Sequence, residues 1–149
     1  MTDKSANEKL QNDPGVNDDA VKNVSKFDWV KERSSCSIPK VYKELRSQVE
    51  VDVKTRNGLR PDNSPYEFSV VERGADFVVL LEAGDIHRSV VFSAAEHAIV
   101  VRDDKGDQMF EMTLSFSDEG DCKWNVKGQE REPWQVRRMA LDEIFFHGY

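Results

Sequence analysis

Residues 77–93 read FVVLLEAGDIHRSVVFS, and this stretch decides the fold. Its two apolar runs are separated by Ala83-Gly84-Asp85, which is typical of a hairpin and too short for a crossover helix. Similar short separators rich in Gly and Asp recur on both sides, so the sequence predicts six strands, at 66–72, 77–82, 86–93, 98–102, 108–116 and 122–127. We therefore expect an antiparallel six-stranded meander sheet, for which strong curvature is one option.

Helical patterns lie on both sides of the strands. Apolar residues recur at spacings of three and four between Ser37 and the terminating pair Asn57-Gly58, namely Ile38, Val41, Tyr42, Leu45, Val49 and Val53. A shorter helix is expected from an N-cap at Ser25 to Ser34-Ser35, and a final helix from Glu132-Pro133 to the chain end. The predicted fold class is α+β, with the sheet flanked by an N-terminal and a C-terminal helix in a single domain at 25–149.

The start of the chain is expected to be a disordered tail, at residues 1–24. It consists mainly of Asn, Asp, Lys, Ser and Gly with a Pro14-Gly15 break, so it offers too little apolar surface to offset its ordering entropy.

Charge and length restrict the classes of partner. The 149-residue chain has a formal net charge of -7, and 58–132 carries 8 basic against 16 acidic residues. Such a region is a poor platform for a phosphate backbone, so no nucleic-acid or membrane partner is expected. No long apolar run or signal peptide is visible, which indicates a cytoplasmic location and two reduced thiols at Cys36 and Cys122.

The middle strands are apolar on both faces, unlike the last two. Helices on one side of the sheet would leave four residues as an apolar patch on the other, namely Val78, Leu80, Val91 and Val100. The expected covers are a second copy, a partner protein, the short N-terminal helix, or curling of the sheet around a small cavity. His87 and Arg88 are included in this candidate binding surface because His87 and Ser89 share a strand face.

Catalytic and metal-binding patterns are not found. His87, His97 and His147 have no partner at metal-ligand spacing, and the acidic turns at 103–107 and 118–121 lack the calcium-loop pattern, so neither metal nor cofactor is expected. Trp29, Trp124 and Trp134 are interpreted as core anchors. If one is functional, Trp134 beside Arg137 and Arg138 forms a candidate surface of the kind enriched at protein interfaces.

The order of helix, antiparallel strands and helix is similar to that of frataxin-like domains. The acidic first helix by which frataxins bind iron is absent, because 37–57 is net basic, so the resemblance implies the fold order alone. The sequence favours a non-catalytic protein-binding or self-associating domain. The alternative is a small-ligand carrier or small enzyme with an apolar pocket under a curved sheet, and an acidic metal-binding accessory protein is a third hypothesis.

Overall fold

The computed structural model describes residues 27–147, and the chain divides into one unit that ends at Lys31 and another that begins at Glu32. Helix α2 (Trp29–Ser35) begins where the Asp28 carboxylate accepts a hydrogen bond of 3.0 Å from the Lys31 backbone N–H. Asp28 therefore caps this helix. The expected cap Ser25 and the expected tail at 1–24 lie outside the described residues.

The unit that begins at Glu32 contains one antiparallel sheet, and the predicted α+β class is confirmed. The strands pair in chain order as a meander, with seven strands instead of the predicted six. They are β1 (Phe68–Arg73), β2 (Asp76–Ala83), β3 (Ile86–Ala94), β4 (Ile99–Arg102), β5 (Gln108–Phe116), β6 (Cys122–Val126) and β7 (Gln129–Arg131).

The additional strand is β7, which pairs with β6 through Trp124 opposite Arg131 and Val126 opposite Gln129. Its three residues are polar, so the alternation of apolar and polar residues that reveals a strand is absent. The turn before it has positive φ at both Lys127 (54°) and Gly128 (76°), as a two-residue hairpin turn requires. The strand therefore forms through its turn and backbone pairing, not through buried side chains.

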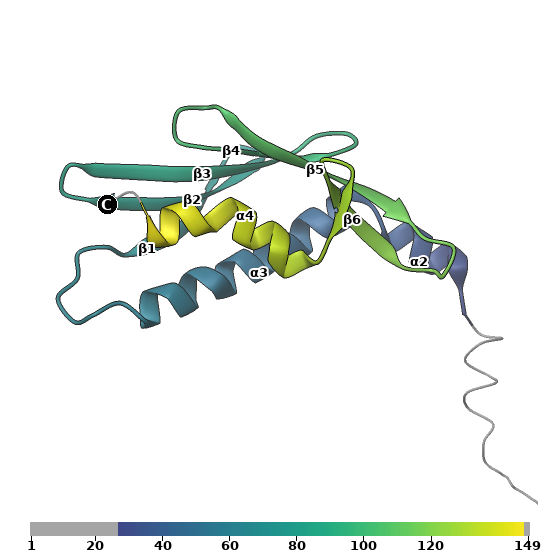
Figure 1. Cartoon of the computed structure of the whole chain (residues 1–149), viewed down its shortest axis with the longest axis horizontal. Helices are drawn as coiled ribbons and strands as arrows, with labels where there is room; N and C mark the ends of the chain where they lie inside the picture. The colour runs from purple at the N-terminus through teal and green to yellow at the C-terminus, as the bar shows by residue number, and fades with distance from the viewer. Residues whose placement is uncertain (1–26, 148–149) are drawn as a thin grey trace, which may run out of the picture. The chain divides into compact units, whose positions relative to one another are not determined.

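Helices α3 (Ile38–Gly58) and α4 (Pro133–Phe146) lie side by side on the same face of the sheet (Figure 1). Both begin as the sequence predicts, with Ser37 and Glu132 as N-caps and a proline in each first turn. Their inward residues pack against alternate strand residues to form one core. The buried helix residues are Ile38, Val41, Leu45, Val49 and Val53 of α3 and Val136, Ala140, Leu141, Ile144 and Phe145 of α4.

The two helices run in the same direction. Arg137 of α4 contacts Asp52 and Gln48 of α3, whereas Arg56, further along α3, donates a hydrogen bond to the carbonyl of Phe145, further along α4. Positions therefore advance together along both helices, so α3 and α4 are parallel.

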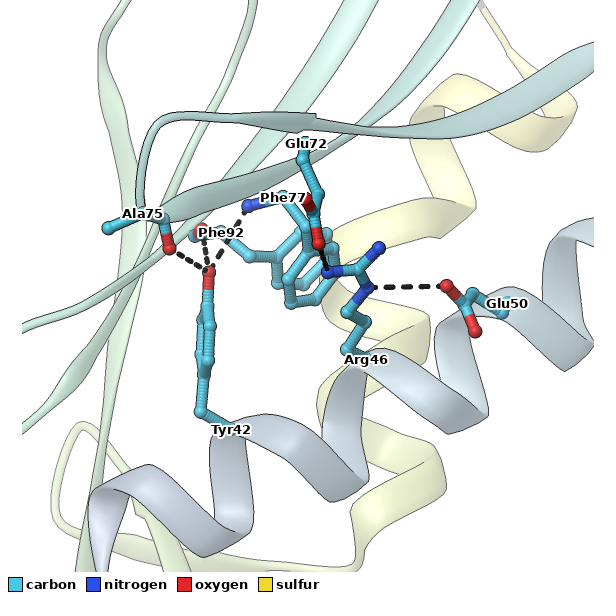
Figure 2. A network of polar contacts seen from close by, with 7 residues as sticks. All are labelled: Tyr42, Arg46, Glu50, Glu72, Ala75, Phe77 and Phe92. Carbon is cyan, nitrogen blue, oxygen red and sulfur yellow. Dashed lines mark hydrogen bonds and ion pairs between the residues drawn. The ribbon is translucent and has the colours of Figure 1, made fainter.

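Tyr42 connects α3 to the sheet (Figure 2). Its hydroxyl accepts a hydrogen bond of 3.1 Å from the Phe77 N–H and contacts the carbonyls of Phe92, at 2.8 Å, and Ala75, at 3.2 Å. Burial is the largest of the effects that raise the pKa of Tyr42 above its ordinary value of 10.0. One turn further on, Arg46 pairs with both Glu50 and Glu72. These contacts fix α3 over β1, β2 and β3.

Cys36 and Cys122 form a disulfide, so the expectation of two reduced thiols is wrong. Their Cα atoms are 5.3 Å apart although 86 positions separate them in the chain. The bond joins the residue before the N-cap of α3 to the start of β6. No local spacing reveals such a pair, because only the meander brings β6 back to this helix end.

Candidate functional site

Apart from Arg88, the structure separates the predicted binding residues into two places. The register pairs Val78 with Val91, Leu80 with Ser89, and Ser93 with Val100, so the four predicted apolar residues share one sheet face. This is the face opposite to the one that α3 and α4 cover, because the intervening residues Val79, Leu81, Val90 and Phe92 belong to the core. The predicted apolar row therefore exists.

The row nevertheless offers little contact area. Val78 is fully buried, and Leu80, Val91 and Val100 are half-buried. The row crosses only three of the seven strands, which are about 4.8 Å apart, so it is too small for the roughly 800 Å² per partner of a standard interface.

His87 and Arg88 do not form a site together. His87 is exposed and its Nδ1 lies 2.9 Å from the carboxylate of Glu82, its cross-strand neighbour. Arg88 lies opposite the core residue Leu81 of β2, so it is on the sheet face that the helices cover. Its guanidinium lies 3.2 Å from the Asp104 carboxylate. The alternation along β3 thus places the two residues on opposite sides.

The second place is a hollow between α3 and α4, which we call the α3–α4 hollow. Its volume is about 400 Å³. Its lining residues are Asp52, Thr55, Arg56, Leu59, Trp134, Arg137, Arg138, Leu141, Asp142, Phe145 and Phe146. All three predicted α4 residues, Trp134, Arg137 and Arg138, therefore line one surface depression.

Exposed apolar side chains gather at this hollow. Among the described residues 32–147, four large apolar side chains are more than half exposed, namely Val51, Leu59, Trp134 and Phe146. Three of them line the hollow, and the fourth, Val51, precedes the lining residue Thr55 by one turn of α3. The predictions of Trp134 and Trp29 as core anchors are wrong. The Trp134 side chain is 55% exposed and the Trp29 side chain is 63% exposed. Trp124 is buried as predicted.

The three arginines of the hollow differ in how firmly the chain holds them. Arg137 is held by Asp52 at 2.6 Å and Gln48 at 2.7 Å. The Arg56 guanidinium lies 5.3 Å from the ring centroids of both Phe68 and Phe146. Arg138 is 70% exposed and its Nε is 3.7 Å from Asp142, a long contact. Arg137 and Arg56 therefore stabilise the packing of the two helices, while Arg138 extends to the rim.

A second hollow of about 420 Å³ adjoins the first across Trp134 and Arg138, which line both. Its other lining residues are Arg131, Gln135, Met139, Asp142 and Glu143, of which Asp142 is also shared. The indole of Trp134 and the guanidinium of Arg138 thus lie between two depressions on the outer side of α4.

Sequence reasoning missed Leu59, Phe146 and Arg56. Leu59 follows the glycine that ends the predicted helix, so it falls outside the apolar spacing of that helix. Phe146 follows the apolar stripe of the last helix but does not fit its spacing. An apolar residue off the buried face of a helix is a sequence signal for an exposed apolar side chain. Arg56 gives no such signal, because its contacts depend on how the helices pair.

Comparisons of the chain with protein families, curated proteins and solved structures find no match. The similarity in element order to frataxin-like domains therefore gains no support. Within residues 27–147, no group of three or more His, Cys, Asp or Glu side chains is placed to hold a metal ion. No helix in that range is long and apolar enough to cross a membrane.

Proposed function

We propose that the protein is a protein-binding domain whose binding surface is the α3–α4 hollow. The observation that carries this proposal is the gathering of Leu59, Trp134 and Phe146, all more than half exposed, around one depression. When a partner covers large apolar side chains that a folded domain leaves in water, the free energy of the complex is lowered.

The residue types at this surface support a protein partner. Trp and Arg are the side chains most enriched among the residues that dominate binding energy, and Trp134 with Arg138 forms the centre of the two adjoining hollows. Behind them, Arg137 and Arg56 tie α4 to α3 through hydrogen bonds, so the surface is already formed by the packed helices. A preformed surface loses little conformational entropy on binding.

The alternative of a small-ligand pocket under the curved sheet has weaker support. The two hollows beside α4 are lined by helix residues, by Leu59 and by Arg131, and neither contains Val78, Leu80, Val91 or Val100. The sheet row also leaves less apolar surface in water than the hollow does, which is why the proposed surface moves from the sheet to the helices.

A selection with three variants tests the proposal. Fragments of the proteins of the source organism are displayed and selected on the full chain, and each enriched fragment is then measured against Trp134→Ala, Val100→Thr and Lys105→Ala. Loss of at least tenfold in affinity for Trp134→Ala alone is expected. Fragments that bind Trp134→Ala as tightly as the parent, or that respond to Val100→Thr instead, would refute the hollow as the binding surface.

The disulfide bears on where the protein works. We propose an oxidising compartment in place of the expected cytoplasm, since structural disulfides persist mainly outside reducing cytosol. Cells are lysed in an alkylating reagent that blocks free thiols, and the chain is then weighed by mass spectrometry. Absence of alkylation at Cys36 and Cys122 is expected, whereas two alkylated thiols would contradict this location.

A further inference from the structure

We propose that the occupant of the α3–α4 hollow is an amphipathic α-helix of about three turns that carries carboxylates beside its apolar face. This inference rests on the proposed function and adds the conformation and charge of the partner segment. Three features of the hollow carry it: its length, the elements that line it, and the position of its exposed arginine.

The length of the hollow corresponds to about three helical turns. Trp134 and Phe146 both line it and lie 12 positions apart on α4, which places them about 18 Å apart along the helix axis. A partner helix that follows this line would present about 12 residues. Its apolar residues would recur at i, i+4, i+7 and i+11 to meet Trp134 at one end and Leu59 and Phe146 at the other.

The lining elements favour a helix over an extended segment. Most of the hollow is formed by α3 and α4, whose backbone groups are hydrogen-bonded within each helix, and no strand edge contributes to it. An extended segment bound here would leave its own N–H and C=O groups unpaired against apolar side chains, and each such group is costly. A helix satisfies these groups internally, so it can bury its apolar face without that penalty.

The charge of the hollow favours an acidic partner. Its lining contains three arginines and two aspartates, a net positive surface on a chain of net charge -7. Arg138 is the most exposed of these arginines and has a contact of 3.7 Å that a closer carboxylate can replace. A Glu or Asp flanking the apolar face of the partner helix is thus complementary to this rim.

The test uses random 16-residue peptides displayed on phage, selected on the full chain and counter-selected on Trp134→Ala. Enriched peptides should show apolar residues at helical spacing with Asp or Glu beside them. A synthetic copy of the tightest peptide should gain helical circular dichroism on binding. Its affinity should fall at least tenfold for Arg138→Glu and recover in part when its own Glu residues become Lys.

Arg73→Glu is the matched control, because Arg73 is exposed on β1, outside both hollows, and the substitution changes the net charge equally. Enriched peptides without helical spacing, a preference for basic residues, or equal effects of Arg138→Glu and Arg73→Glu would each overturn the inference. A dimer seen by light scattering that Trp134→Ala dissociates would also overturn it, in favour of a second copy of the chain. If the peptide selection overturns this inference but the earlier selection yields protein fragments whose binding depends on Trp134, the proposed function stands.

Discussion

Removing the Cys36–Cys122 disulfide should lower the stability of the domain substantially. The bond closes a loop across 86 positions. The chain-entropy relation for a cross-link of this span gives about 4.6 kcal/mol of lost stability at 25 °C. Domains of this size are stable by only about 5 to 15 kcal/mol, so the loss is a large share of the total. The melting temperature of the double variant Cys36→Ala/Cys122→Ala should fall by roughly 15 to 20 °C.

The measurement is urea unfolding of the oxidised parent, the parent reduced with a phosphine, and the double variant, each followed by tryptophan fluorescence. The reduced parent and the double variant should unfold at similar urea concentrations, well below the oxidised parent. Agreement of all three free energies of unfolding within about 1 kcal/mol would refute the loop-closure reasoning. Titration of two free thiols in the purified parent would refute the bond itself.

Three smaller predictions concern the contacts of α3 and α4. Tyr42→Phe keeps the ring but leaves the Phe77 N–H without its acceptor, so the free energy of unfolding should fall by about 1 to 3 kcal/mol in urea titrations, and an unchanged value would show that this contact is dispensable. Because the pKa of Tyr42 is raised above 10.0 in the folded chain, chiefly by burial, the stability that this group contributes is fully present below that pH and is lost as pH rises through its raised pKa. The difference in stability between parent and Tyr42→Phe should accordingly stay constant below about pH 10 and shrink as the pH rises above it, and a difference that stays constant above pH 10 would contradict the linkage. Gln135→Ala removes the acceptor of the Glu132 N–H, at 2.8 Å, and should cost about 0.5 to 1 kcal/mol, with Gln135→Glu as the control that keeps an acceptor.

The meander could be predicted from the sequence because its determinants are local. The separators at 83–85 and 103–107 specify short hairpins, and the regular apolar spacing from Ile38 to Val53 specifies a helix. Strand β7 escaped prediction because its pairing depends on the turn at Lys127-Gly128 and on the backbone of β6, not on its own side chains.

The candidate site was only partly predictable for a related reason. Trp134, Arg137 and Arg138 were selected because they are neighbours in one helix, but Leu59 and Arg56 belong to the same hollow through the packing of α3 against α4. Asp52 shows the limit most clearly. The spacing of four predicts a pair with Arg56, whereas its shown partner is Arg137 of the other helix. Contacts between distant segments require the register of the packed helices, which sequence spacing does not specify.

The short strand β7 has a topological effect out of proportion to its three residues. Each hairpin reverses the direction of the chain, so an odd number of strands returns it for α4 in the same direction as α3, whereas six strands would have left the two helices antiparallel. The two peptide dipoles are consequently aligned and their negative ends lie together, near Arg56 and Phe145. A third helix seated against both is electrostatically favoured when it enters antiparallel, with its amino-terminal end at that side. The parallel alignment of the two helix dipoles thus depends on a turn of two residues, Lys127 and Gly128.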